Sequence, residues 1–366
     1  MSQRRASERW AGRSLVDSEP TMYLPIDGGL PEESAVGEQG QPARRRSRAT
    51  RVALITGLVV ALLAGGGAIA AGLYVRSVES NLTRVDAFEN VPEDSRPAKV
   101  SEAMNFLILG SDSRDPDVTG SRTDTIILAH IPADRSAAQL ISIPRDTWVP
   151  LAKSPSGKGG HEAKINAAFS LGGVPLMVQT VESFTGVRID HVVLIDFGGF
   201  KEIVDALGGV DIAVDQNFTS IHPPKRKFTK GMMHMDGETA LDYARQRYQF
   251  KDGDFARIRH QQQLIKAVLD KAASTGMLAN PAQLNSFLRA TADAVTVDQT
   301  FSLLDMAMEL RHLRGHNLTF MTSPTKGTGR IGNQSVVLAD TEKVKEFYDA
   351  VRRDAVDEFT ALATKK

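Results

Sequence analysis

Three short aliphatic runs, close together in the sequence, constrain the fold of this 366-residue chain more than any other feature. They occupy residues 106–109, 126–129 and 140–143, and each is bounded by glycine, proline or charged residues. Runs of this length and composition are typical of buried β-strands. The sequence therefore predicts three strands within residues 105–146, around which the rest of the domain is organised.

Charged residues gather where these predicted strands begin or end. Asp112 follows the first run, Arg122 and Asp124 lead into the second, and Arg145 and Asp146 follow the third. Carboxylates and guanidiniums at strand ends are typical of α/β active sites, because a rigid sheet holds the loops that carry them. We therefore expect a functional site at this edge of the sheet.

Further short elements follow the opening strands. The sequence predicts strands over residues 191–195, 210–214 and 318–322, and helices over residues 175–184, 200–207, 281–291, 300–314 and 341–360. Proline near a helix start and glycine after a helix end support several of these bounds. Strands that alternate with helices indicate an α/β domain in which helices cover a sheet.

A second concentration of polar residues lies within residues 236–272. The alternation over residues 243–248 predicts a strand that would place Arg245 and Arg247 on one face. A turn over residues 252–254 precedes a helix in which Arg257 and Gln261 stand at positions i and i+4. Residues at that spacing project from the same face of a helix.

Each of these charged sets has two interpretations. Asp112 and Asp124 either converge on a hard cation such as Mg²⁺, which prefers oxygen ligands, or cap turns and pair with nearby arginines. The arginines either bind a diphosphate through their planar forks or form ordinary surface ion pairs. The spacing alone leaves both alternatives open.

An uncharged run over residues 52–75 is long enough to cross a bilayer, which takes roughly 20 apolar residues. A signal peptide is the alternative, but its apolar core is usually only about 7–15 residues long. Five arginines precede the run, at positions 44, 45, 46, 48 and 51, so the positive-inside rule puts the N-terminus in the cytoplasm. The chemistry is then expected outside the cell membrane.

These features predict four parts of the chain. Residues 1–51 are expected to form a disordered cytoplasmic region, residues 52–75 a single transmembrane helix and residues 76–100 an extracellular stalk. Residues 101–366 are expected to form one extracellular domain that contains the site.

Composition and motif spacing exclude several classes of protein. The absence of cysteine excludes disulfides, thiolate metal sites and a cysteine nucleophile. Equal numbers of basic and acidic residues, 44 each, give no reason to expect nucleic acid as a partner. The GxGxxG pattern over residues 327–332 is not followed by the helix of a nucleotide fold, so we interpret it as a loop. His161, His191 and His260 lack zinc spacing and are interpreted as structural or exposed.

Six motifs, taken together, resemble one known family. They are GSDSR (110–114), SRTDTIIL (121–128), SIPRD (142–146), KINAAF (164–169), IDFGGFKEIVDALGGVDI (195–212) and DGETALDYARQRYQFKDGDFARIRHQQQ (236–263). In this order, behind a single expected membrane span, they resemble the LytR-CpsA-Psr family over about residues 101–275. The resemblance implies a central mixed β-sheet flanked by helices, in an α/β/α sandwich.

The resemblance also implies a membrane-anchored phosphotransferase. Members of the family move a glycopolymer, such as a teichoic acid, from a polyprenyl diphosphate carrier onto peptidoglycan. By resemblance, Asp112 and Asp124 bind Mg²⁺, Asp254 supports the arginine cluster, and the diphosphate is held by Arg122, Arg145, Arg245, Arg247, Arg257 and Gln261. The chain departs from the family at His260, where many members carry arginine.

The expected reaction follows from these residues. Arginine forks and Mg²⁺ would neutralise the diphosphate while a peptidoglycan hydroxyl attacks the phosphorus that bears the polymer. Asp112, Arg122 and Arg145 are the expected catalytic residues, with Asp112 helping to activate the hydroxyl. The apolar strands and the helix over residues 175–184 either line a groove for the lipid chain or pack as plain core.

Three other functions stay open. The protein could instead be a membrane-anchored regulator, a non-catalytic polyprenyl-phosphate binding protein, or a diphosphatase that passes the phosphate to water. The absence of a basic helix that could recognise DNA argues against the regulator.

Overall fold

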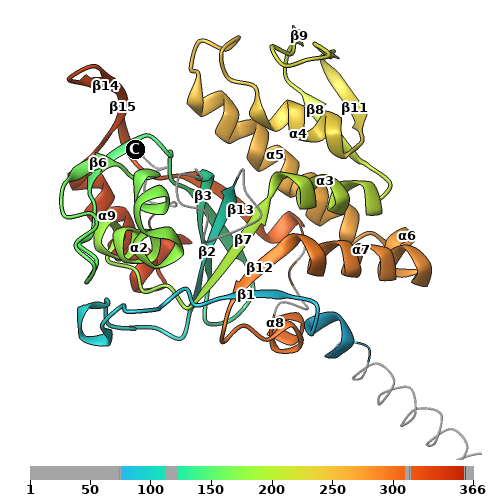
Figure 1. Cartoon of the computed structure of the whole chain (residues 1–366). Helices are drawn as coiled ribbons and strands as arrows, with labels where there is room; N and C mark the ends of the chain where they lie inside the picture. Colours follow the sequence, from blue (N-terminus) through green and yellow to red (C-terminus); the bar gives the residue numbers. More distant parts are fainter. Residues whose placement is uncertain are drawn as a thin grey trace, which may run out of the picture. The chain divides into compact units, whose positions relative to one another are not determined.

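The computed structural model describes residues 74, 76–111, 123–309, 313, 315–357 and 359. Within these ranges, the organising feature is a seven-stranded sheet at the centre of Figure 1. In spatial order its strands are β1 (Thr83–Val85), β12 (Val295–Asp298), β7 (His191–Asp196), β2 (Met104–Ser111), β3 (Thr123–Ile131), β4 (Ala138–Ser142) and β13 (Leu318–Thr322).

The central sheet is mixed. β2 pairs antiparallel with β3 and parallel with β7, and β3 pairs antiparallel with β4. Both faces of β2 and β4 are largely buried, which is why the runs are aliphatic throughout instead of alternating with polar residues. The three predicted opening strands and the mixed sheet are confirmed.

Helices α2 (Ala167–Thr185) and α9 (Thr341–Arg352) cover one face of the sheet (Figure 1). Leu109 of β2, Val181 of α2 and Tyr348 of α9 lie in one buried cluster. α2 is broken at Gly172 and Gly173, where Gly173 has a φ of 64°. The predicted helix over residues 175–184 is therefore the regular part of α2.

The other face is covered by α3 (Phe197–Ala206), α5 (Asp254–Ala272), α7 (Pro281–Ala294) and α8 (Leu303–Glu309). Ile127 and Leu140 share a buried cluster with Met306 of α8. Ile265 of α5 packs against the same cluster. The predicted arrangement of a sheet between two helix layers is confirmed.

A smaller lobe packs beside this second helix layer. β8 (Val210–Val214) does not join the central sheet but pairs antiparallel with β11 (Gly231–Met235). The lobe also contains β9 (Phe218–Thr219), β10 (Lys227–Phe228), α4 (Gly237–Arg245) and α6 (Thr275–Leu278). It has its own buried cluster, to which Tyr243 of α4 and Leu264 of α5 belong.

The strand predicted over residues 243–248 is wrong, because Arg245 is the last residue of helix α4. The Asp236 carboxylate caps this helix by accepting a hydrogen bond from the Thr239 backbone N–H at 2.8 Å. Ala240, Tyr243 and Ala244 are buried at helical spacing. The cap and this apolar face outweigh the short alternation that suggested a strand.

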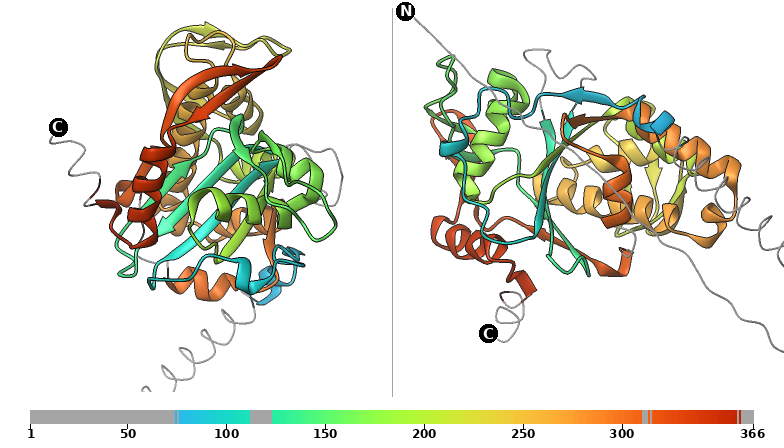
Figure 2. Two further views of the ribbon diagram at one scale, coloured as in Figure 1. Left: turned by 90° about the vertical axis from the view of Figure 1, so that its left-hand side faces the viewer. Right: turned by 90° about the horizontal axis from the view of Figure 1, so that it is seen from below.

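A four-stranded sheet stands apart from the central one. It consists of β14 (Thr325–Ile331), β15 (Gln334–Ala339), β5 (Thr147–Pro150) and β6 (Glu162–Lys164), and Figure 2 shows β14 and β15 as a long hairpin. The glycine pattern over residues 327–332 lies in this hairpin, so its interpretation as a loop is wrong. A Cβ atom at Gly329 would lie 2.7 Å from Cδ1 of Leu338, so the leucine side chain would have to shift.

Part of the segment predicted as a stalk packs onto the domain. β1 pairs in parallel with β12, and the 3₁₀ helix η1 (Glu93–Ser95) leads to Arg96. Arg96 forms an ion pair with Glu182 of α2 at 2.7 Å, with side chains only 8% and 3% exposed. A second 3₁₀ helix, η2 (Gly315–Asn317), precedes β13.

No helix within the described ranges is long and apolar enough to cross a membrane. The predicted transmembrane helix over residues 52–75 lies outside these ranges, apart from Tyr74. The predicted disordered region over residues 1–51 also lies outside them.

An aromatic cluster joins α5 to the lobe. His260 is 1% exposed, and its ring centroid lies 4.3 Å from that of Tyr243 and 4.8 Å from that of Phe250. Burial lowers the pKa of His260 to about 4, so the ring is neutral at pH 7. His260 is thus structural, as the sequence predicts.

We expect this burial to make folding sensitive to mild acid. Below pH 6.5 the unfolded chain binds a proton at His260, whereas the folded chain binds it only at about pH 4. The free energy of unfolding therefore falls as the pH drops from 6.5 to 4. The loss in the free energy of unfolding should approach about 3 kcal/mol. Urea unfolding at pH 7 and pH 4.5 should show a smaller loss for His260→Phe than for the wild type. The exposed-site control His161→Phe should match the wild type. Equal losses in all three proteins would contradict this explanation.

Candidate active site

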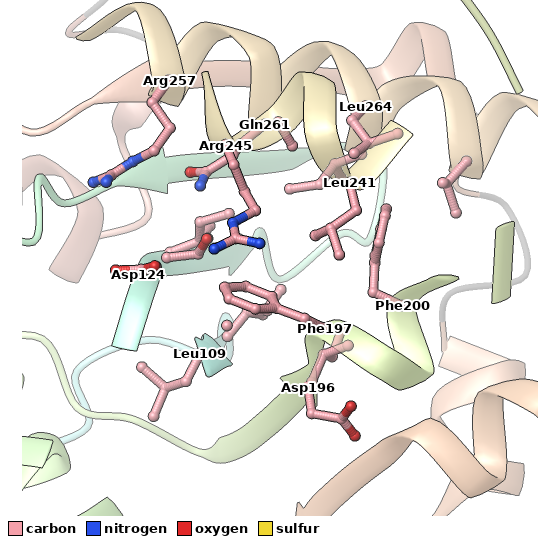
Figure 3. Close-up of a pocket in the computed structure, with 18 of the residues that line it drawn as sticks. Leu109, Asp124, Asp196, Phe197, Phe200, Leu241, Arg245, Arg257, Gln261 and Leu264 are labelled. Carbon is pink, nitrogen blue, oxygen red and sulfur yellow. The ribbon is translucent and has the colours of Figure 1, made fainter. Parts of the chain in front are cut away.

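A cavity of about 460 Å³ lies between the central sheet and helices α3, α4 and α5. Most of its wall is apolar and comes from both layers: Ile108, Leu109, Ile127, Leu140, Ile195, Phe197, Phe200, Ile203, Leu241, Ala244, Leu264, Ile265, Val268 and Leu269. Figure 3 shows Leu109 on the sheet side, Phe197 and Phe200 on α3, and Leu241 and Leu264 on the opposite side.

One part of the same cavity is charged. Its polar side chains include six that the sequence predicts as site residues: Asp124, Arg145, Arg245, Arg247, Arg257 and Gln261. Figure 3 shows Arg245, Arg257 and Gln261 reaching toward the strand that carries Asp124. Residues separated by more than a hundred positions in the chain therefore meet at one wall.

Helix α5 supplies two of these side chains. Arg257 and Gln261 are one turn apart and both line the cavity, as their spacing predicts. The next glutamines have other partners: Gln262 donates to the Ser142 hydroxyl at 3.1 Å, and Gln263 accepts from the Tyr243 hydroxyl at 2.7 Å. These two bonds tie α5 to the sheet and to the lobe, and so fix which face of the helix meets the cavity.

Asp254 lies behind the arginines, on the first residue of α5. Its carboxylate is 2.6 Å from Arg257 and 3.5 Å from Arg247. The Arg257 side chain is only 5% exposed, and this burial lowers its pKa while the nearby Asp254 carboxylate raises it. An arginine stays charged at neutral pH even so. Asp254 therefore stabilises a buried positive charge, in agreement with the supporting role that the resemblance implies.

Asp124 on β3 pairs with Arg145, which follows β4. The two side chains are 25% and 14% exposed. Mg²⁺ is usually held by one or two carboxylates together with substrate phosphates and water, so an aspartate on the cavity wall fits such an ion. The described residues contain no cluster of three or more metal-ligating side chains. Asp112, the second predicted ligand, lies outside the described residues.

Aromatic rings hold the other two arginines. The Arg245 guanidinium lies 5.3 Å from the ring centre of Phe197, and the Arg247 guanidinium lies 4.5 Å from that of Tyr248. A ring face attracts the cation without cancelling its charge. Four guanidiniums and two carboxylates, those of Asp124 and Asp196, line this cavity. The carboxylates of Asp254 and Asp146 contact the arginines from outside its wall.

Two of the guanidiniums also keep unused donors. The Nε atoms of Arg145 and Arg257 are buried and have no hydrogen-bond acceptor within the described residues. A buried donor without an acceptor costs free energy, so a missing acceptor is expected there. The oxygens of an anionic ligand would supply it.

Two predicted site residues, Asp112 and Arg122, lie outside the described residues. Their predicted roles in metal binding and catalysis stay predictions. Asp196 also lines the cavity, but its carboxylate accepts backbone N–H groups of Gly198 and Gly199 at 2.7 and 2.9 Å and caps α3. Figure 3 shows the Asp196 side chain directed away from Arg245 and Arg257.

The apolar wall decides between the two alternatives left open for the lipid groove. The opening strands do line the cavity, but α2 lies in the core on the other face of the sheet, so the helix over residues 175–184 lines no part of this cavity. Phe197 and Phe200 of α3 and Leu264 of α5 take that place. The FGGF motif, with aromatic residues at i and i+3, was the available signal for the α3 side.

A second, more polar cavity of about 1050 Å³ adjoins the first and shares Arg145, Arg247 and Tyr248 with it. Lys164 of β6 lines this second cavity and pairs with Asp146 at 3.0 Å. The sequence places Lys164 in a motif but assigns it no role. The three shared residues form a boundary between an apolar space and a polar one.

Comparison with known proteins agrees with this geometry. The LytR_cpsA_psr family model matches residues 74–353. The chain is 35% identical to the polyisoprenyl-teichoic acid–peptidoglycan teichoic acid transferase TagU of Bacillus cereus over 255 residues, which are 68% of this chain and 80% of that protein. It is 28% identical to the cell wall biosynthesis protein LcpA of Corynebacterium glutamicum over 377 aligned positions, covering 91% of this chain and 70% of LcpA.

Among solved structures, that of TagV from Bacillus subtilis superposes with a TM-score of 0.60 at 28% identity. The match covers 69% of this chain and 97% of the TagV chain. With the family model covering most of the sequence, the motifs and the fold lead to one conclusion: the chain belongs to the LytR_cpsA_psr family.

Proposed function

We propose that this protein transfers a glycopolymer from a polyprenyl diphosphate carrier to a hydroxyl group of peptidoglycan. The observation that carries the proposal is the position of four arginines at the charged part of an otherwise apolar cavity. A polyprenyl diphosphate has the same two parts, an anionic diphosphate and an apolar chain. One ligand of this kind would fill both parts of the cavity.

The charges of the site support this donor. A diphosphate esterified at both ends carries two negative charges, and the cavity wall carries four guanidiniums but only two carboxylates within the described residues. Its oxygens would also accept hydrogen bonds from the buried Nε atoms of Arg145 and Arg257. The names of two relatives, a teichoic acid–peptidoglycan transferase and a cell wall biosynthesis protein, support the same class of reaction.

The reaction forms one phosphorus–oxygen bond and breaks another. The acceptor hydroxyl oxygen attacks the phosphorus that bears the polymer, and the bond from that phosphorus to the bridging oxygen breaks. Polyprenyl phosphate leaves, and the hydroxyl proton ends on this departing phosphate. Arg145, Arg245, Arg247 and Arg257 bind the diphosphate and stabilise the charge that develops on the bridging oxygen. Asp112 is proposed to help take the hydroxyl proton.

Asp124 and Asp112 are the residues that would hold Mg²⁺. A bound Mg²⁺ would supply additional positive charge for the phosphate oxygens. Arg145 pairs with Asp124, so the same arginine positions the carboxylate and contacts the donor.

A membrane location follows from the same proposal. Residues 52–75 would span the cell membrane once, with the N-terminus in the cytoplasm and the domain outside. No ATP is available there, so an activated donor must arrive on a lipid carrier. Tyr74 itself donates a hydrogen bond from its hydroxyl to the Asn285 side chain of α7 at 2.7 Å.

The decisive experiment identifies the lipid and follows its phosphate. Mass spectrometry of lipid bound to the full chain should detect a polyprenyl phosphate or diphosphate. With a labelled polyprenyl-diphosphate saccharide and peptidoglycan, the label should appear on sugar. Label released only to water would indicate a diphosphatase, and bound lipid that never reacts would indicate a binding protein. A domain that external protease cannot reach would favour the regulator.

Replacing Arg257 should impair transfer far more than replacing Arg259, two residues away on the same helix. Arg257 lines the cavity and is buried, whereas Arg259 is 47% exposed and pairs with Asp252. Loss of one buried donor to a developing charge typically costs about 100-fold in rate. We expect that loss in kcat for Arg257→Gln and less than about twofold for Arg259→Gln. Equal activity of the two variants would contradict the assigned donor site.

Replacing Asp124 should raise the requirement for Mg²⁺. Asp124→Asn removes a charged oxygen ligand, so the Mg²⁺ concentration for half-maximal transfer should rise about tenfold. Chelation of Mg²⁺ should stop transfer by the wild type. The exposed carboxylate variant Asp211→Asn serves as control and should keep the wild-type dependence. Undiminished transfer in chelator would show that the metal has no part in the reaction.

A further inference from the structure

The polar cavity beside the donor site has no role in the proposed transfer as described so far. It is the larger of the two, at about 1050 Å³. It is bounded by the loop after β4, by β6 and the start of α2, by the loop that leads into α5, and by the β14–β15 hairpin. Its wall contains Asn166, Ser170, Thr328, Gln334 and Ser335, which are hydroxyl and amide side chains. Such groups both donate and accept hydrogen bonds.

Aromatic rings stand among these polar groups. Tyr248, which is 70% exposed, lines both cavities, and Phe250 and Phe255 line the polar one. Hydroxyl and amide groups interleaved with ring faces suit a glycan, whose sugar rings combine hydroxyl edges with apolar C–H faces.

The charges of the polar cavity differ from those of the donor site. Arg145, Lys164, Arg247 and Lys251 line it together with Asp146, Asp252 and Asp254, so positive and negative groups nearly balance. Lys164 is paired with Asp146. The polar cavity therefore offers a second diphosphate less excess positive charge than the donor site does. A glycan is uncharged at its hydroxyl groups and needs no excess positive charge to bind.

The direction of the reaction adds an independent constraint. In phosphoryl transfer the attacking and leaving oxygens lie roughly in line on opposite sides of the phosphorus. In the proposed function the leaving polyprenyl phosphate has its chain in the apolar cavity. The acceptor must then approach from the side of the arginines that faces away from the apolar cavity. Arg145 and Arg247 line both cavities, so the space on that side is the polar cavity.

We propose that the polar cavity is the acceptor site and binds a peptidoglycan glycan strand, with the β14–β15 hairpin as its outer wall. This inference rests on the proposed function and names the second substrate's place in it. Tyr248 stands at the boundary between the two substrates, and the hairpin residues Thr328 and Ser335 contact the glycan at a distance from the diphosphate. The hydroxyl that reacts is the one directed past Tyr248 toward Arg145.

Bulky substitutions on the hairpin test this assignment. Thr328 and Ser335 are exposed, lie on different strands of the hairpin and line the polar cavity but not the apolar one. Thr328→Trp and Ser335→Trp would therefore occupy glycan space without entering the donor cavity. Lys326→Trp is the matched control, because Lys326 is exposed on the same strand and lines neither cavity.

The assay uses the full chain in mild detergent, with a labelled polyprenyl-diphosphate disaccharide as donor and uncross-linked peptidoglycan strands as acceptor. We expect both cavity variants to raise the KM for the acceptor by at least about tenfold. The KM for the donor and the slow hydrolysis of donor without acceptor should stay within about twofold of the wild type. Lys326→Trp should change none of these values. Unfolding temperatures of all variants verify that each is folded.

Three results would overturn the inference. An unchanged acceptor KM in both cavity variants, with normal transfer by the wild type, would contradict the acceptor site and leave the proposed function standing. A variant that discriminates against donors with longer glycans, instead of against the acceptor, would assign the cavity to the donor's polymer. Absence of any transfer by the wild type would reject the proposed function itself, together with this inference.

Discussion

The buried ion pair between Asp254 and Arg257 is the interaction on which the site depends. The two side chains are only 10% and 5% exposed, and removing one partner of such a pair typically destabilises a protein by about 3–5 kcal/mol. The pair sits in the first turn of α5, the helix that also carries Gln261 and Leu264 into the cavity. The Asp254 carboxylate thus offsets the cost of burying the positive charge of Arg257.

The other arginines are held in ways that preserve their charge. Arg245 lies over Phe197, and Arg247 lies beside Tyr248 while sharing Asp254 with Arg257. Ring faces orient a guanidinium without neutralising it. Had each arginine its own carboxylate, the site would be neutral and would offer little to an anion. The fold thus positions the cluster firmly and leaves part of its charge for a ligand.

Local patterns predicted much of this structure. The aliphatic runs identified β2, β3 and β4, and the i, i+4 spacing placed Arg257 and Gln261 on one face of α5. The error over residues 243–248 arose because six residues of alternation carry less information than a helix cap and a buried face that become visible only in the lobe. Phe197 and Phe200 were missed for a related reason: whether an aromatic residue lines a cavity or fills a core depends on what packs opposite it. No pattern in the sequence states that.

The way residues 76–100 pack has a consequence for where the protein can work. β1 begins at Thr83, eight residues after the proposed membrane span ends at residue 75, and eight fully extended residues reach at most about 29 Å. Residues 76–79 are helical and Tyr74 is hydrogen-bonded to α7, so the actual reach is shorter. With residues 52–75 as the proposed membrane span, the domain would therefore lie close to the outer leaflet. In that position the apolar cavity would receive a carrier lipid whose chain stays partly in the bilayer.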